Sequence, residues 1–367
     1  MRYTLTFLLL SCYTYVFSCY NEFYALDAKG RFHQVEVGAI RFQTNFDLRR
    51  VENQLAKLGK KLQSKADFKV LSDYGLYLVR GGKVKEALIL FEALAKAYPN
   101  EYSIISNLGT TYELSGNNVK ALEYIRKGLK LNPDSHDGSE WIHVKLLLAK
   151  IALEKDPHYF EKNTILKLTP KQEASEAIRK QLFTQLRERF PFCKGPDPVM
   201  ADLLIDLGDC YTASISFEHA NGLYQIAKLY YQSERTDIEE KIKQVRKLRS
   251  KYAHLQPEPH QVMDGSDVGK ITGVPYESYL KNPNADNYLV NWSKIETDPK
   301  KLLAFIHLKL VEEPVQSEQI KPAPKKPETK KVIQPTKTSN SPVLWMGLVI
   351  VVFILSIFTY FKARKRK

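Results

Sequence analysis

Two adjoining stretches decide the fold: FKVLSDYGLYLVRGGKVKEALILFEALAKAYPNE at residues 68–101 and YSIISNLGTTYELSGNNVKALEYIRKGLKLNPDS at residues 102–135. Small residues and prolines keep their places when the second stretch is laid on the first at an offset of 34 residues. The aligned pairs are Gly75 with Gly109, Gly82 with Gly116, Ala87 with Ala121, and Pro99 with Pro133. A period of this length, with small residues at fixed places, is typical of helix–turn–helix repeats that stack into a solenoid.

Each stretch predicts two antiparallel helices. Gly75 and Ala87 lie twelve positions apart on helices joined at Gly81-Gly82, and small side chains let two helices approach closely. Pro99 terminates the second helix, because proline cannot continue a helix and disfavours helical backbone in the residue before it. One such unit cannot bury its apolar face alone, so the units must stack.

These residues resemble the tetratricopeptide repeat, which places Leu-Gly-x-x-Tyr before Ala-x-x-x-Phe and then Pro. The second copy reads NLGTTY, ALEYI and NP, and the first reads DYGLYL, ALILF and YP. A third, degenerate copy from Ala201 reads DLGDCY, with Gly208 and Ala220 again twelve positions apart but without the closing proline. The resemblance implies an all-α, TPR-like helical solenoid.

In this family the first helix of each repeat lines a concave surface that binds a protein or peptide partner. The resemblance implies that this partner-binding groove is formed by Lys69, Ser72, Leu76, Arg80, Ser103, Ser106, Asn107, Thr110 and Glu113. Some family members hold a partner's C-terminal carboxylate with Lys and Asn. Asn107 matches that pattern, but Ser72 and Leu76 replace the Lys and Asn of the first repeat, which argues against this mode. The alternative for all nine positions is a solvated helix face.

Weaker patterns flank the two repeats. Residues 20–67 predict a short hairpin around Lys29-Gly30 and a leading helix, and residues 136–255 predict degenerate TPR-like helices with a charged cap. Residues 256–313 are irregular. The helices expected in these regions are Trp141–Leu153, 170–189, one starting near Pro198, Asp237–Leu255 and Pro299–Val311.

The first nineteen residues have the layout of a secretory signal peptide. Arg2 precedes an apolar stretch from Leu5 to Phe17, and the small Ser18 follows. Cleavage after Ser18 would leave Cys19 at the new N-terminus, where lipidation is one possibility and an ordinary signal peptide or a short uncleaved anchor are the others.

The other end predicts a membrane anchor. Val343–Phe361 contains 19 residues without a charge, 13 of which are Val, Leu, Ile or Phe. At 1.5 Å per residue it spans roughly 28 Å, close to the hydrocarbon thickness of a bilayer. The tail at 362–367 carries five cations, which stay on the cytoplasmic side, so the repeats are expected outside the cytoplasm, in the periplasm. Residues 314–342, with six prolines and six lysines, predict an extended linker.

The net charge of +14 is concentrated in this C-terminal part. Residues 314–367 hold eleven Lys and Arg against two Glu, which leaves +5 for the rest of the chain. The remaining charge of +5 is too small to indicate a nucleic-acid-binding surface, so no nucleic-acid partner is expected. The spacing of Cys193 and Cys210, with a helix starting between them, predicts two separate thiols with Cys210 in the core.

No catalytic, cofactor or metal motif stands out. GSDVGKIT at 265–272 fails as a phosphate-binding loop, because its first glycine is one residue too close and Ile271 replaces the required Ser or Thr. His136 and His143 lie seven apart without a Cys or carboxylate partner at ligand spacing. We therefore expect no enzyme activity, cofactor or metal, and interpret the chain as a membrane-tethered scaffold for protein–protein interaction in the cell envelope. The alternative functions are an accessory subunit of an envelope enzyme, or an unrecognised enzyme with its chemistry in residues 256–312. The alternative location is the eukaryotic secretory pathway, where Asn291 would be glycosylated.

Overall fold

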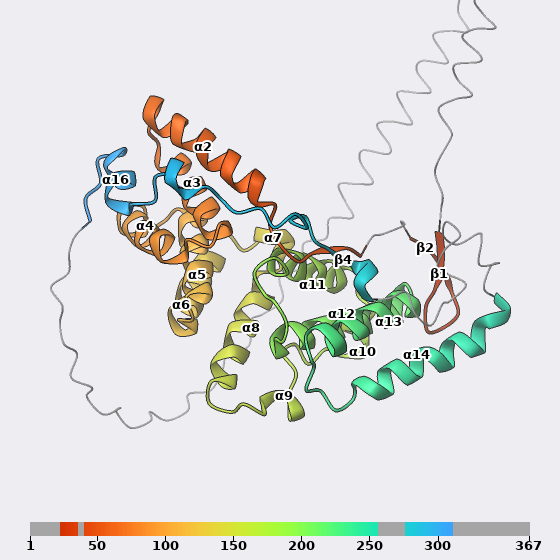
Figure 1. Cartoon of the computed structure of the whole chain (residues 1–367). Coiled ribbons are helices and arrows are strands. Elements are labelled where there is room, and N and C mark those ends of the chain that lie inside the picture. The colour runs from red at the N-terminus through yellow and green to blue at the C-terminus, as the bar shows by residue number, and fades with distance from the viewer. Residues whose placement is uncertain (1–22, 36–39, 256–275, 311–367) are drawn as a thin grey trace, which may run out of the picture. The chain divides into compact units, whose positions relative to one another are not determined.

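The computed structural model describes residues 23–35, 40–255 and 276–310, and these residues are predominantly helical, as the sequence predicts. In Figure 1 the chain passes from helix to neighbouring helix, from α2 to α14. The longer helices are α2 (Leu48–Ser64), α3 (Phe68–Arg80), α4 (Val84–Ala97), α5 (Tyr102–Leu114), α6 (Asn118–Leu131), α8 (Glu140–Leu153), α11 (Glu176–Arg189), α12 (Pro198–Ser214), α13 (Phe217–Gln225) and α14 (Ile238–Tyr252).

The 34-residue period of the sequence is visible in the helix boundaries. Helices α3 and α5 both contain 13 residues and start at Phe68 and Tyr102, which are 34 positions apart. Helices α4 and α6 both contain 14 residues and start at Val84 and Asn118, again 34 positions apart. The turns between the helices pass through Gly82 and Gly116, both with positive φ, the backbone conformation that glycine adopts at no steric cost.

The two helices of each unit cross at a glycine. A Cβ on Gly109 would lie 2.7 Å from Ile125 Cδ1, and one on Gly75 would lie 2.8 Å from the Phe91 ring. In the degenerate copy, a Cβ on Gly208 would lie 2.3 Å from the Tyr224 ring. The nearest neighbour of each glycine is therefore sixteen positions further along the chain. This corrects the expectation that each glycine faces the alanine twelve positions on, because the large side chain one turn beyond that alanine fills the crossing.

Consecutive packing extends beyond the two repeats. Each long helix contacts the next one along the chain, from α2 to α6, then α6 with α8, α8 with α11, and α11 through α14. Buried Leu, Ile, Val and aromatic side chains form a single cluster that runs through all of these helices. The stacking that one helical unit needs in order to bury its apolar face is therefore present along the described chain.

The single helix expected at 170–189 is wrong. The structure has a short helix α10 (Pro170–Glu173), an interruption, and then α11. Ser175 causes the interruption, because its side chain accepts a hydrogen bond from the backbone N–H of Ile178 and so caps a new helix. Further short helices are α7 (Ser135–Gly138) and α9 (Tyr159–Lys162), a π-helical turn follows α13 at Ile226–Tyr230, and 3₁₀ turns lie at Ala253–Leu255 and Tyr276–Tyr279.

The hairpin expected around Lys29-Gly30 is present. Strands β1 (Phe23–Leu26) and β2 (Phe32–Val35) pair antiparallel, and Gly30 has positive φ in the turn. A second, two-residue ladder pairs β3 (Phe42–Gln43) with β4 (Leu280–Lys281) in parallel. Phe42 is fully buried and stacks on Phe190 at a centroid distance of 4.1 Å, so this early segment joins the end of α11.

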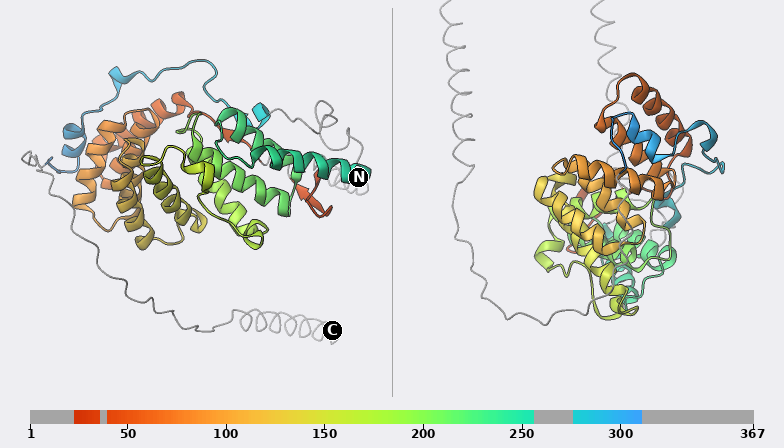
Figure 2. Two further views of the ribbon diagram at one scale, coloured as in Figure 1. Left: turned by 90° about the horizontal axis from the view of Figure 1, so that it is seen from below. Right: turned by 90° about the vertical axis from the view of Figure 1, so that its left-hand side faces the viewer.

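The sequence offered no account of how the last described segment packs, and the structure supplies one. Residues 276–310 run back along the N-terminal helices, as Figure 2 shows, and end with α16 (Pro299–Ala304) against α4. The Tyr74 hydroxyl donates to the Glu296 carbonyl at 2.7 Å, and the Leu48 N–H donates to Asn284 Oδ1 at 2.9 Å. The final helix is shorter than expected, because the chain turns after Ala304 and reaches positive φ at His307.

The expected signal peptide at 1–19, linker at 314–342, membrane helix at Val343–Phe361 and tail at 362–367 lie outside the described residues. Within residues 23–35, 40–255 and 276–310, no helix combines the length and the hydropathy needed to cross a membrane. Both cysteines of the described part carry free thiols, and Cys210 is fully buried in the core as expected.

Candidate functional site

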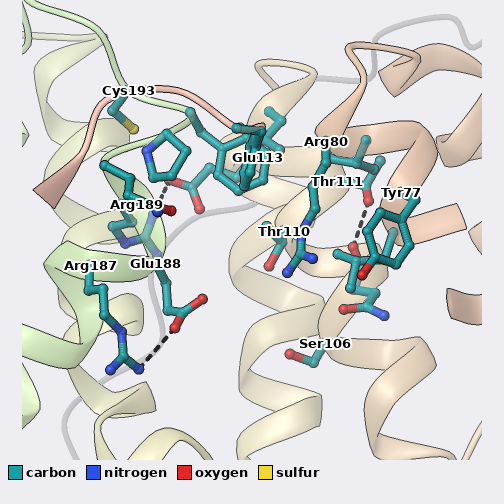
Figure 3. A pocket seen from close by; sticks show the side chains of 18 of the residues that line it. Tyr77, Arg80, Ser106, Thr110, Thr111, Glu113, Arg187, Glu188, Arg189 and Cys193 are labelled. Atoms are coloured by element: carbon teal, nitrogen blue, oxygen red, sulfur yellow. Dashed lines mark hydrogen bonds and ion pairs between the residues drawn. The ribbon is translucent and has the colours of Figure 1, made fainter. Parts of the chain in front are cut away.

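A pocket of about 530 Å³ lies between the first helices of the two repeats and the end of α11. Helices α3 and α5 form one wall, and residues 185–193 at the end of α11 and in the loop after it form the opposite one. Figure 3 shows the two groups of side chains, with Tyr77, Arg80 and Thr110 on one side and Arg187, Glu188, Arg189 and Cys193 on the other. The start of α2 with the residues just before it, His136 of α7, Glu140 and His143 at the start of α8, Phe91 of α4, and Pro283 from the returning C-terminal segment also line the pocket. The volume lies within the range of ligand-binding pockets.

The pocket brings together most of the residues expected in the groove. Six of the nine line it: Leu76, Arg80, Ser106, Asn107, Thr110 and Glu113. The other three do not. Lys69 and Ser103 are exposed at positions outside the pocket, and Ser72 is buried at 3% exposure within the helix packing.

Glu113 differs from the expectation of a solvated groove residue. Its side chain is only 2% exposed, and its carboxylate accepts from Lys150 Nζ at 2.8 Å and from Arg189 Nη1 at 2.9 Å, while His143 Nε2 lies 2.8 Å away. Burial by itself would raise the pKa of Glu113, but the charges of Arg189, Lys150 and His143 outweigh it and hold the pKa well below its usual range. Glu113 therefore anchors α5 to α8 and α11 and stiffens the floor of the pocket.

Glu140 corrects the interpretation of the two histidines. It lies one helical turn before His143 in α8, while His136 lies just before that helix, and its carboxylate is 3.6 Å from His136 Nε2 and 3.2 Å from His143 Nδ1. The pair therefore does have a carboxylate partner, and His143 joins Glu140 to Glu113. Within residues 23–35, 40–255 and 276–310, no group of three or more His, Cys, Asp or Glu has the arrangement of a metal site.

Cys193 is the one thiol on the pocket wall among the described residues. Burial, reinforced by the negative charge of Asp197, raises the pKa of the Cys193 thiol to about 11 despite the nearby Lys150 and Arg189. A thiol with so high a pKa is protonated at neutral pH, and the protonated form is a poor nucleophile. Cys193 is therefore a poor candidate for a nucleophile.

Arg80 occupies a different environment from the other charges of the pocket. Its guanidinium carbon lies 5.1 Å from the centroid of the Tyr77 ring and 5.6 Å from that of the Phe46 ring. Its Nε is buried and has no hydrogen-bond partner among the described residues. Cation–π contact therefore holds the plane of the group, while its hydrogen-bonding capacity is not used within the described chain.

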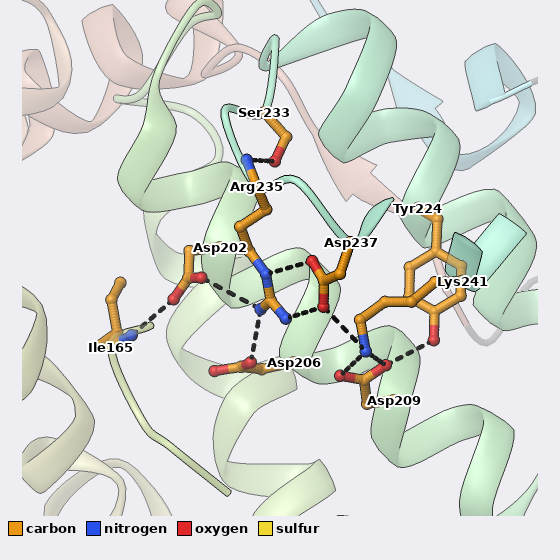
Figure 4. Close-up of polar contacts among 9 residues, drawn as sticks. All are labelled: Ile165, Asp202, Asp206, Asp209, Tyr224, Ser233, Arg235, Asp237 and Lys241. Carbon is orange, nitrogen blue, oxygen red and sulfur yellow. Dashed lines mark hydrogen bonds and ion pairs between the residues drawn. The ribbon is translucent and has the colours of Figure 1, made fainter. Parts of the chain in front are cut away.

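A second charged cluster, formed by residues that do not line the pocket, joins α12 to α14 (Figure 4). Arg235 Nη1 lies 3.2 Å from Asp202 and 3.3 Å from Asp206, and Arg235 Nη2 lies 2.7 Å from Asp237. Lys241 donates to Asp209 at 2.8 Å. Burial raises the pKa of Asp202 to about 6 against the opposing charge of Arg235, and burial together with the charge of Asp202 raises the pKa of Asp206 well above its usual range. Since these contacts tie neighbouring helices together, we assign the cluster a structural role.

Comparison with known proteins adds no family assignment. No protein-family model matches the chain, and no curated protein sequence matches it either.

Several pocket residues could not be found from the repeats. Arg50, Phe46 and Pro283 lie outside residues 68–135, and Arg189 reaches Glu113 across 76 positions of sequence. One local signal was available. Glu140 lies three positions before His143, a spacing that places the two on one helix face, and four positions after His136.

Proposed function

We propose that the protein is a membrane-tethered interaction scaffold of the tetratricopeptide-repeat type, acting in the cell envelope. The observation that carries the proposal is the pocket, where six residues of the expected binding face meet the end of α11. A repeat solenoid presents its first helices as a binding surface, and here that surface is closed on its other sides into a defined site.

Three polar side chains of α5 support a role in binding. Ser106, Asn107 and Thr110 all line the pocket, and no described residue forms a hydrogen bond with any of their side-chain polar atoms. Residues three and four apart lie on one helix face, so these groups point the same way. Hydroxyl and amide groups in such a row can bind the backbone of an extended protein segment.

Site-specific photo-crosslinking in the full-length protein tests the proposal. A photoreactive amino acid placed at Thr110, in the pocket, is expected to yield a defined adduct with one partner protein in intact cells. The control is Val119 on α6, which is 64% exposed and does not line the pocket. No adduct at Thr110, or an equal pattern at both positions, would refute the binding role. Turnover of a cell-wall or peptide substrate by the purified protein would favour the enzyme alternative instead.

The location is part of the proposal and rests on the two ends of the sequence. An apolar stretch at 343–361 followed by five cations places the tail in the cytoplasm and the repeats outside. Protease added to intact cells or spheroplasts is expected to degrade residues 68–232 while sparing the extreme C-terminus. Protection of the repeats until the membrane is lysed would overturn the topology.

A further inference from the structure

The pocket lining contains four carboxylates and four guanidinium groups. Three of the carboxylates lie in ion-pair contacts within the described chain. Glu113 contacts Arg189, Lys150 and His143, Glu140 contacts His136 and His143, and Glu188 pairs with Arg187 at 3.1 Å. Asp47 accepts a hydrogen bond from the backbone N–H of Arg50 and caps α2.

Two guanidinium groups remain. Neither Arg80 nor Arg50 forms an ion pair with any carboxylate of residues 23–35, 40–255 or 276–310, although both line the pocket. The Nε of Arg80 is buried without a hydrogen-bond partner within that same part of the chain, a costly state for a polar group unless something else binds it. Arg80 therefore holds an unpaired positive charge in the pocket, whereas Arg50 lies three positions from Asp47, the one lining carboxylate without an ion pair within the described residues.

The geometry of Arg80 narrows the class of ligand. Its guanidinium is held against Tyr77 and Phe46 by ring contacts, which leave the N–H groups at its edge free. A guanidinium edge matches a carboxylate in a bidentate pair, and fixing its plane in advance reduces the entropy lost on binding. Thr110, on the facing helix, offers a hydroxyl group beside it (Figure 3), and Asn107 of the same helix also lines the pocket with its amide group.

We propose that this pocket binds an acidic segment of a protein partner, with the Arg80 guanidinium pairing an Asp or Glu carboxylate and Arg50 adding positive charge at the rim. The inference rests on the proposed function and specifies the chemistry of the partner. We expect the carboxylate to belong to a side chain within the segment. Phe46, Tyr77 and the polar residues of α5 also line the pocket, where neighbouring residues of the same segment can contact them.

Fluorescence anisotropy with full-length protein in mild detergent tests the inference. The probes are labelled hexaglutamate and hexaglutamine peptides with blocked ends. Hexaglutamate is expected to bind at least about tenfold more tightly, which corresponds to about 1.4 kcal/mol. Arg80→Gln should weaken the binding of hexaglutamate by about this factor. Arg126→Gln, on the exposed face of α6 and away from the pocket, removes the same charge and should change the affinity less than about twofold.

Two further arms keep the test decisive. Arg80→Glu should reverse the preference, so that a hexalysine peptide binds more tightly than hexaglutamate, an outcome that a misfolded variant would not give. Inorganic phosphate should compete no better than glutarate at equal ionic strength.

An equal loss of hexaglutamate affinity in Arg80→Gln and Arg126→Gln would overturn the inference. It would mean that the peptide binds through general positive charge, such as that of the basic linker or tail, and not in the pocket. Stronger competition by phosphate would overturn it in favour of a small-anion site. If either result is found while the Thr110 variant still crosslinks to a partner, only this inference is refuted. If the Thr110 variant gives no adduct at all, the proposed function is refuted as well.

Discussion

The crossing of α5 and α6 at Gly109 gives the sharpest stability prediction. A Cβ at Gly109 would lie 2.7 Å from Ile125 Cδ1 and 3.1 Å from the Ile125 backbone nitrogen, closer than carbon and nitrogen atoms pack without displacement. Ile125 is 1% exposed and is packed within the buried apolar cluster. Gly109→Ala should therefore carry an overpacking cost of about 1–3 kcal/mol.

The matched control is Gly59→Ala in α2. A Cβ at Gly59 would meet only Tyr74 Cε2 at 3.7 Å, an ordinary contact distance. Both substitutions gain about 1 kcal/mol of helix propensity, so the difference between them isolates the steric term. Gly59→Ala should stabilise the protein.

The two variants should be compared by thermal unfolding, followed by circular dichroism. At about 2–4 °C per kcal/mol, the Tm of Gly109→Ala should fall about 2–12 °C below that of Gly59→Ala. Gly109→Leu should lie lower still, and Ser103→Ala, on an exposed face, should change stability by less than about 0.5 kcal/mol. Equal Tm values for Gly109→Ala and Gly59→Ala would refute the proposed helix crossing.

Two further predictions concern the buried charges. Glu113→Gln should destabilise the protein by about 3–5 kcal/mol in urea unfolding, because it leaves buried cations without their carboxylate, whereas Glu188→Gln, in an exposed pair, should cost less than about 1 kcal/mol. Burial raises the pKa of Asp202 to about 6, so its protonated form stabilises the fold at low pH, and this contribution is lost as the pH rises from about 4 through about 6. Between pH 4.5 and 7.5 the contribution should fall by about 2 kcal/mol. Asp206→Asn should also reduce the pH dependence of stability, because it removes a second buried carboxylate whose pKa is raised well above its usual range, and an unchanged pH profile in this variant would contradict the assignment.

The repeats were predictable because the same packing problem recurs. Helices that cross at a glycine need that glycine again one unit later, so Gly75 and Gly109 mark the period in the sequence itself. The same reasoning placed six of nine groove residues on one pocket, because position along a helix fixes the face on which a side chain lies. It could not identify the neighbour of Gly109, since Ala121 and Ile125 lie on the same face one turn apart and side-chain size decides between them.

Contacts between distant segments were not predictable. Arg189 meets Glu113 only because α8 and α11 fold back beside α5, and nothing periodic in the sequence specifies that return. Residues 276–298 have no helical or strand period, and they are held by individual hydrogen bonds such as Tyr74 to Glu296. Pro283 therefore entered the pocket lining from a region in which no pattern indicated a site.

The central claim is that the pocket between α3, α5 and the end of α11 is where a partner protein binds. Hydrogen exchange of the full-length protein, with and without the partner identified by crosslinking at Thr110, measures this most directly. The account predicts added protection in α3, α5 and residues 185–193, with little change in α6, whose residues do not line the pocket. Protection confined to α6 or α14, with the backbone around Arg80 and Thr110 unchanged, would contradict it.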